Sequence, residues 1–406
     1  MNKLYLFLFL LVASSLLSSC DKENENASGF LAEKSGRQYV SENNEFGLNL
    51  FRKVNVLSSD NNKLISPFNI SMAMGMTYNG AANRTADQIK SVLGWENLSS
   101  DEINRYNKEL LSSLFANSEN IQLNIANSIW YGDNIDIKSE FLRKNSSVFD
   151  AEIFKVDFSD NSTVRKMNDW VQSSTNRELN SIVDGISSRD MMCFINTTYF
   201  HGVWKHSFNT KNTSKAEFFV TNGDKRDVEM MYQKSDLNYY KGNSFQFVEM
   251  PYENENYVMY IMLPDEDSDI DEVISTLDYN KWNSYKSELE IKRNINFGLP
   301  KFKFQQQTSL IKLLSSMGIE NLFVPEKSDL SNICDRKIFI NQMMHNATIE
   351  VNEKGTKATA ASSVASTFTA LVDDNPFNLI VDRPFLFTIE EKSTNTILFI
   401  GEIVNP

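Results

Sequence analysis

The most informative stretch of this chain of 406 residues reads Glu353-Lys354-Gly355-Thr356-Lys357-Ala358-Thr359-Ala360-Ala361-Ser362-Ser363-Val364-Ala365. After its single glycine it consists almost entirely of Ala, Ser, Thr and Val. Apolar, strand-like segments lie on both sides, at 338–351 and at 379–388, the second broken by Pro384. The region between them is roughly twice the length at which a loop without secondary structure becomes unusual, which indicates a functional loop.

The side chains of this loop are small on one side. If the loop were drawn out as a β-strand, alternate residues would face the same way. One face would carry only small uncharged side chains, namely Thr356, Ala358, Ala360, Ser362, Val364 and Ser366. The nearby charge of Lys357 falls on the other face. This pattern is typical of a strand that must enter a closed sheet, although a flexible Ala/Ser/Thr linker has the same composition.

Longer motifs around the loop resemble those of the serpin family. EKGT at 353–356, followed by the Ala-rich run, resembles the hinge of the serpin reactive-centre loop. DRPFLF at 382–387 and ILFIGEIVNP at 397–406 resemble the C-terminal signature, and NTTYFHGVW at 196–204 resembles the central-sheet motif. The resemblance runs from about residue 37 to the last residue. It implies a serpin fold with three β-sheets, about nine helices and an exposed reactive-centre loop at about 353–378.

The order of predicted elements agrees with an α+β fold, because helices concentrate early and strands late. Ser66-Pro67 predicts an N-cap with proline in the first turn of a helix that ends near Gly80. Capping boxes are predicted at 85–88 and 99–102. Hydrophobic periodicity predicts further helices around 46–57, 167–175 and 309–317, and further strands at 121–131, 191–204, 245–250, 257–263 and 299–304.

Composition bounds the class of protein. No repeat or Pro/Gly/Ser-rich linker divides residues 37–406, which we therefore expect to form one domain. An apolar content of 41% with 28 Phe can fill a large core. The net charge of −13 argues against nucleic acid as a partner, since a nucleic-acid footprint needs clustered Lys and Arg.

The N-terminus reads as a lipoprotein signal. Lys3 precedes a short apolar run, and residues 1–19 are predicted to be a signal peptide. LSSC at 17–20 resembles a bacterial lipobox, in which Cys20 is acylated, although an ordinary signal with a stray cysteine is the alternative. Residues 20–36 have the composition of a disordered tether. We expect a domain anchored in the cell envelope, at the outer membrane, facing the periplasm or the exterior.

No pattern in the chain marks an enzyme. The chain has three histidines, His201, His206 and His345, and it lacks the nucleophile, zinc and phosphate-loop motifs that single out a catalytic site. No cofactor or metal is expected. Cys193 lies in an apolar strand and reads as a small core residue, and a disulfide between it and Cys334 stays open.

The serpin resemblance assigns roles to particular residues. The hinge is expected at Glu353, Gly355 and Thr356 and on through Ala358, Ala360 and Ser362. Glu353 and Lys301 match the pair that closes the top of the sheet, and Trp204 matches the tryptophan beside it. Asn196 and His345 fall in the polar cluster at the centre of the sheet, above a helix that begins at Ser66. Asn69 departs from the serine common in the family, so hydrogen bonding there is expected to differ.

The implied function is inhibition of a serine-type endopeptidase as a suicide substrate. Counting from Glu353 along the usual spacing gives Thr369-Ala370 as the reactive bond, with Phe368 and Leu371 as neighbours, whereas counting back from Pro384 lands several residues later. Because no Lys or Arg lies between Lys357 and Arg383, elastase-like or chymotrypsin-like targets are expected, and a cysteine protease also forms the required acyl-enzyme. The partner would be bound covalently by a monomer.

Two other functions fit the sequence. One is a non-inhibitory carrier or chaperone with the serpin fold, which usually shows bulky or charged residues on the inserting face. The other is a surface lipoprotein that binds glycans or proteins and carries no trap.

Overall fold

Two β-sheets and the helices around them make up the part of the chain that the computed structural model describes: residues 29–58, 62–118, 120–175, 177, 181–220, 223–356 and 377–406. The predicted α+β class is confirmed. The helices are α1 (Lys34–Leu57), α2 (Pro67–Tyr78), α3 (Asn83–Leu93), α4 (Ser100–Ala116), α5 (Ser139–Phe149), α6 (Ser162–Ser174), α7 (Ile270–Thr276), α8 (Tyr279–Ser287) and α9 (Leu310–Met317).

The first sheet has six strands and contains the segments that flank the loop. Its order is β10 (Phe302–Ser309), β11 (Gln342–Asn352), β12 (Gly355–Thr356), β4 (Met192–Val203), β2 (Ile121–Gly132) and β3 (Glu152–Val156). β11 also pairs directly with β4, in parallel. Ten of the twelve residues of β4 are buried, as expected for a strand covered on both faces.

The second sheet has nine strands. Its order is β1 (Lys63–Ile65), β15 (Thr396–Ile403), β14 (Phe385–Glu391), β8 (Tyr257–Pro264), β7 (Phe245–Pro251), β6 (Lys225–Lys241), β9 (Glu290–Pro300) and β13 (Asn378–Ile380), with β5 (Thr213–Phe219) paired to β6. Three sheets were expected, and the described residues form two hydrogen-bonded ones. The reason is β6, which has an irregular register between Ser235 and Leu237 and pairs with both β7 and β9.

Helix α2 lies between the two sheets. It contacts β4 on one side and β15 on the other, and all its residues from Pro67 to Thr77 are buried. The Ser66 side chain accepts a hydrogen bond from the Asn69 N–H, and Pro67 occupies the first turn, as predicted. This placement puts the start of α2 directly against the six-stranded sheet.

The two predicted capping boxes have different outcomes. Ser99 and Glu102 form a complete capping box at the start of α4. The box predicted at 85–88 is wrong, because α3 already begins at Asn83 and its N-cap Ala82 offers no side-chain bond. The Thr85 hydroxyl instead accepts a hydrogen bond from the Asp329 N–H at 3.0 Å, so a tertiary contact uses the group that the pattern assigned to a cap.

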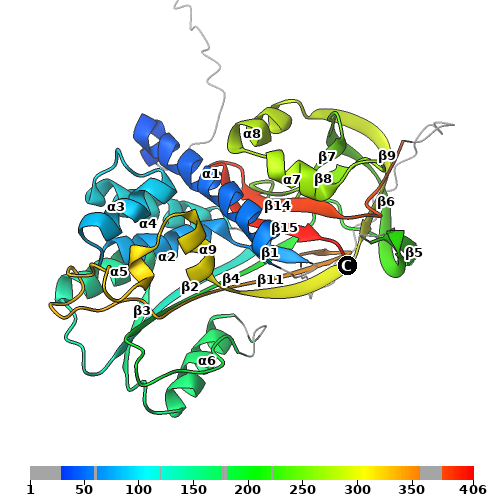
Figure 1. The fold of residues 1–406 in the computed structure, drawn as a ribbon. Coiled ribbons are helices and arrows are strands. Elements are labelled where there is room, and N and C mark those ends of the chain that lie inside the picture. The colour runs from blue at the N-terminus through cyan, green and yellow to red at the C-terminus, as the bar shows by residue number, and fades with distance from the viewer. Residues whose placement is uncertain are drawn as a thin grey trace, which may run out of the picture.

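Helix α6 covers the face of the six-stranded sheet that is opposite to α2 (Figure 1). It packs there in a hydrophobic cluster of its own, which includes Trp130, Met167, Trp170 and Ile195. Cys193 lies in the same cluster, and its burial raises the pKa of the thiol. Cys193 is buried, as predicted for a core residue, and the disulfide with Cys334 that the sequence left open is not formed, because both cysteines are free.

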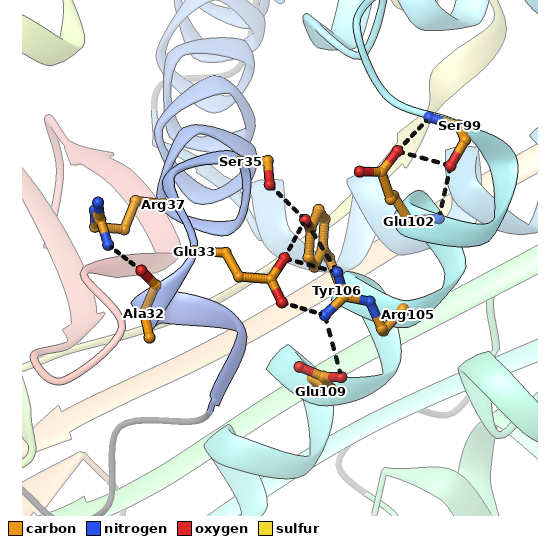
Figure 2. Close-up of polar contacts among 9 residues, drawn as sticks. All are labelled: Ala32, Glu33, Ser35, Arg37, Ser99, Glu102, Arg105, Tyr106 and Glu109. Carbon is orange, nitrogen blue, oxygen red and sulfur yellow. Dashed lines mark hydrogen bonds and ion pairs between the residues drawn. The ribbon is translucent and has the colours of Figure 1, made fainter.

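The chain in front of α1 is folded onto α4, where a tether was expected through residue 36. Phe30, in the short 3-10 helix η1 (Gly29–Ala32), is fully buried. The Arg105 guanidinium donates two hydrogen bonds to the Glu33 carboxylate, at 2.8 and 2.7 Å, and the Tyr106 hydroxyl donates a third (Figure 2). Arg105 is the main reason that the pKa of Glu33 falls to about 2. The tether prediction is therefore wrong for residues 29–36, and residues 20–28 lie outside the described part.

Candidate functional site

The strands on either side of the predicted loop are paired along only part of their length. β11 and β4 pair in parallel from Gln342–Cys193 to Thr348–Tyr199. Beyond this point β12 lies between them and pairs antiparallel with both, so that Thr356 faces Val351 on β11 and Gly202 on β4. The chain therefore turns back after β11 and enters the sheet as a two-residue strand.

The turn between β11 and β12 is held by backbone hydrogen bonds. The Trp204 N–H donates to the Lys354 carbonyl at 2.9 Å, and the Phe208 N–H donates to the Glu353 carbonyl at 2.8 Å. Gly355 has a φ of +153°, and a Cβ there would lie 2.0 Å from the Gly202 carbonyl oxygen. Only glycine fits this close approach, which gives the predicted hinge glycine a physical reason.

The predicted pair at the top of the sheet is present. The Glu353 carboxylate lies 3.5 Å from Lys301 Nζ and accepts a hydrogen bond from the Thr213 hydroxyl at 2.8 Å. Lys301 also pairs with Glu229 at 3.1 Å. Partial burial disfavours the charged form of Lys301, but the two carboxylates outweigh it and raise its pKa. The two side chains therefore stay charged and tie the turn to the edge of the neighbouring strands.

Thr356 is bound by a residue that the sequence did not indicate. Its hydroxyl shares a hydrogen bond of 2.7 Å with the Tyr252 hydroxyl, and both side chains are fully buried. The Trp204 ring stacks on Tyr252 at a centroid distance of 4.6 Å, and the Trp204 Nε1–H donates to the Asn352 carbonyl at 3.1 Å. No motif around Tyr252 could have marked it, because its contacts arise only when β7 and the turn meet.

The predicted polar cluster lies lower in the sheet, where β4 and β11 are still paired. His345 and Asn196 stand opposite each other in the parallel register. The Ser66 N–H donates to His345 Nε2 at 3.0 Å, and Asn196 donates to Asn127. Burial lowers the pKa of His345 to about 3, so the ring is neutral at pH 7. Because Nε2 accepts a hydrogen bond, the proton of the neutral ring lies on Nδ1.

Three polar atoms of this cluster have no partner within the described part of the chain: His345 Nδ1, Asn196 Oδ1 and Asn69 Oδ1. All three side chains are fully buried. Unpaired buried polar groups are unfavourable, and in native proteins they commonly mark a functional site. Asn69 adds a contact that a serine could not make, since its side-chain amide reaches the Thr197 carbonyl on β4 at 3.0 Å.

Several predicted residues lie outside the described part of the chain. These are the later hinge residues Ala358, Ala360 and Ser362, the bait residues Phe368, Thr369, Ala370 and Leu371, and the acylation site Cys20. Across the ranges that are described, no helix is both long and apolar enough to cross a membrane. In those same ranges, no three His, Cys, Asp or Glu side chains are grouped as a metal site would require.

Comparison with known proteins agrees with the geometry. A family model described as serpin (serine protease inhibitor) matches residues 41–406. The human leukocyte elastase inhibitor is 30% identical over 383 residues, which cover 91% of this chain and 100% of that protein. The crystal structure of tengpin, a thermophilic serpin in its native state, matches with a TM-score of 0.84 and 32% identity, covering 91% of this chain and 94% of tengpin.

A third comparison concerns a binding protein with the same fold. The crystal structure of human thyroxine-binding globulin matches with a TM-score of 0.85 and 25% identity, covering 92% of this chain and 99% of the globulin. The family model, the leukocyte elastase inhibitor and the tengpin structure all extend over nearly the whole folded part of the chain. The chain belongs to the serpin family.

Proposed function

We propose that this serpin inhibits a protease as a suicide substrate whose cut loop becomes a new strand between β4 and β11. The observation that carries this proposal is the two-residue strand β12, which already lies between those strands and is antiparallel to both. A loop that continues β12 in the same direction would lengthen an existing strand and leave the strand order of the sheet unchanged. It has only to replace the β4–β11 hydrogen bonds between Gln342–Cys193 and Thr348–Tyr199.

The register of β12 supports the proposal further. Thr356 faces Val351 and Gly202, and in an antiparallel ladder each step forward on the loop is one step back on both partners. Six steps on, Ser362 would face residue 351 − 6, His345, and residue 202 − 6, Asn196. Both of these residues carry a buried polar atom without a partner among the described residues.

The chemistry of this position is complementary. A serine hydroxyl can accept a hydrogen bond and donate one. Ser362 would accept from the His345 Nδ1–H and donate to Asn196 Oδ1. The inserted strand would therefore complete a network that is incomplete before insertion, which favours the inserted state.

The reaction proposed for the loop is ordinary acyl transfer up to its midpoint. The protease nucleophile attacks the carbonyl carbon of the bait residue, for which we propose Thr369, and the amine of Ala370 leaves with a proton. The acyl-enzyme then holds the protease on the cut end of the loop. Insertion of that end between β4 and β11 carries the protease along. The protease active site is thereby distorted before water can hydrolyse the acyl-enzyme.

The target is proposed from the bait region. Residues 358–382 contain no Lys or Arg, so a trypsin-like protease would find no basic residue there. Thr, Ala and Val suit an elastase-like protease, and Phe368 suits a chymotrypsin-like one. The leukocyte elastase inhibitor among the relatives is consistent with the first of these.

A denaturing gel tests the proposal most simply. The protein is incubated with a neutrophil-type elastase, with chymotrypsin and with trypsin, and with elastase whose serine is chemically blocked. We expect an SDS-resistant adduct of serpin and protease with elastase or chymotrypsin and none with blocked enzyme. Peptide sequencing of the released fragment then gives the bond, and a cut beyond Val372 would move it from Thr369-Ala370.

The same gel separates the alternative functions. A carrier with the serpin fold, comparable to thyroxine-binding globulin, would be cleaved without an adduct, and a binding lipoprotein without a trap would not react in this way. The proposed hinge argues for the inhibitor, because Thr356 is already accepted between β4 and β11 and the residues that follow on its face through Ser366 are all small and uncharged.

We also propose that the domain is a monomer, anchored through acylated Cys20 to the outer membrane and facing the periplasm or the exterior. The sequence of residues 1–20 supports the anchor. Metabolic labelling with a fatty acid should mark the wild-type protein and leave Cys20→Ala unlabelled. Release of the wild-type domain into the soluble fraction without label would contradict the anchor.

A further inference from the structure

The hinge enters the sheet to one defined depth. Pairing between β4 and β11 ends at Thr348–Tyr199, and Thr356 is inserted three residues further along each strand, between Val351 and Gly202. A deeper position would require the Thr348–Tyr199 bonds to break after two more residues had entered. A shallower position would withdraw Thr356 from a site in which its side chain is fully buried.

One side chain holds Thr356 at this depth. The Tyr252 hydroxyl shares a hydrogen bond of 2.7 Å with the Thr356 hydroxyl. Both groups are removed from solvent, so withdrawal of Thr356 leaves the Tyr252 hydroxyl unpaired in an apolar environment. The burial also raises the pKa of Tyr252, which keeps its hydroxyl protonated and able to donate.

The Tyr252 ring itself cannot follow a moving hinge. It stacks on Trp204 with an interplanar angle of 14° and meets the Phe200 ring edge to face at 5.0 Å. Trp204 in turn donates to the Asn352 carbonyl on the strand from which the hinge turns back. These ring contacts therefore hold the Tyr252 hydroxyl at a fixed position next to the six-stranded sheet.

We propose that Tyr252 is the positioning residue that sets how far the hinge is inserted before the loop is cut. This inference rests on the proposed function, since it concerns where insertion starts. With Thr356 bound, the cut loop continues from an existing strand and does not have to find the gap between β4 and β11. Loss of the bond should let the hinge leave the sheet more often, so that more acyl-enzyme is hydrolysed before insertion.

Hydrogen–deuterium exchange of the intact protein measures hinge position without any protease. In Tyr252→Phe, the ring stack stays and only the hydroxyl is lost, and peptides that span Gly355 and Thr356 should exchange about threefold to tenfold faster, the effect of one buried hydrogen bond. Thr356→Val removes the other hydroxyl and should do the same. The double variant should exchange no faster than either single variant, because both changes remove one bond.

Tyr257→Phe is the matched control. Tyr257 is also fully buried and packs on Phe200, but its hydroxyl donates to the Leu114 carbonyl at 2.7 Å, away from the hinge. It should leave hinge exchange unchanged. The proposal is overturned if Tyr252→Phe leaves the hinge peptides at the wild-type rate, if Tyr257→Phe accelerates them equally, or if the double variant is additive.

The number of inhibitor molecules consumed for each protease molecule inactivated then connects the hinge position to inhibition. With elastase or chymotrypsin, Tyr252→Phe should need about twofold or more inhibitor per enzyme inactivated, and Tyr257→Phe should match wild type. If wild type forms no covalent complex while hinge exchange responds as stated, suicide inhibition fails and the positioning by Tyr252 stands. If covalent complexes form and hinge exchange does not respond to Tyr252→Phe, positioning by Tyr252 fails and suicide inhibition stands.

Discussion

His345 makes the centre of the six-stranded sheet sensitive to acid. Burial holds its pKa at about 3 in the folded protein, against an ordinary value of 6.5. The neutral ring is thus favoured by folding, and its contribution to stability is complete above pH 6.5 and lost as pH falls toward 3. A charged ring would have to form beside Asn196, and burial is the cause of the lowered pKa, with no carboxylate of the described residues offsetting it.

His345→Gln should flatten this dependence. The wild-type urea midpoint is expected to fall between pH 7 and pH 5 by the equivalent of about 2 kcal/mol. Glutamine can still accept from the Ser66 N–H and does not titrate, so the variant should lose less over the same interval. His206→Gln, at an exposed position, is the control and should follow wild type. Parallel slopes for all three proteins would contradict the assignment.

Thr356 tests the direction of the inserting strand. Thr356→Arg would place a cation where the threonine is now fully buried, and an unpaired buried charge is strongly unfavourable. We expect the variant to be cleaved by elastase or chymotrypsin as a substrate, with covalent complex reduced at least tenfold on a gel. Lys357→Arg changes the neighbouring residue, which would face outward, and should keep complex formation. Undiminished complex with Thr356→Arg would contradict insertion through this residue.

Ser362 tests the register. If it completes the His345–Asn196 network only after insertion, Ser362→Ala should destabilise the cleaved form by about 1–2 kcal/mol and leave the intact form unchanged. Ser363→Ala, on the opposite face, should affect neither form. The melting temperatures of intact and cleaved protein measure this difference. Equal effects of the two alanine variants on the cleaved form would show that the register of β12 does not continue into the loop.

The contribution of the short helix η1 to the stability of the domain can be measured. Phe30 is fully buried and its ring centroid lies 5.7 Å from that of Tyr106 on α4. Phe30→Ala should lower the free energy of unfolding by about 3 kcal/mol, since the cavity is not refilled. Phe115→Ala, at a position 42% exposed, should cost less than about 1 kcal/mol. Similar urea midpoints for both variants would mean that residues 29–32 are not part of the folded domain.

At the same scale, periodic elements were predictable and contacts between elements were not. The cap at Ser66, the capping box at Ser99 and the strands at 191–204 and 257–263 follow from local pattern, and the structure has them. Thr85 misled because a distant loop uses its hydroxyl. The stretch before α1 has the polar composition of a tether, yet it is docked, because one buried phenylalanine, Phe30, and the ion pair between Glu33 and Arg105 on α4 hold it.

The candidate site shows the same division. Glu353, Gly355, Thr356 and Lys301 were predictable, because the motif specifies them by resemblance. The partners Tyr252 and Thr213 were not, since Tyr252 follows β7, Thr213 begins β5, and no spacing in the sequence connects them to the hinge. The continuous nine-stranded sheet was likewise missed, because only a long irregular β6 joins its two parts.

Across the whole molecule, we expect the arrangement before cleavage to be less stable than the one that loop insertion would give. β4 and β11 pair in parallel, although the segment after β11 can pair antiparallel with both of them. His345 Nδ1 and Asn196 Oδ1 stay unpaired in this state within the described residues. Insertion of about a dozen loop residues would add a ladder of hydrogen bonds worth roughly 0.5–1.5 kcal/mol each.

Scanning calorimetry of one preparation, before and after limited cleavage near Thr369, measures that difference directly. We predict that the cleaved protein melts at least several degrees higher than the intact one. A cut in an ordinary loop lowers the melting temperature or leaves it unchanged. Thr356→Arg, cleaved in the same way, should show no such rise. An unchanged or lower transition in the cleaved wild-type protein would mean that its loop does not insert, and the proposed inhibition would be wrong.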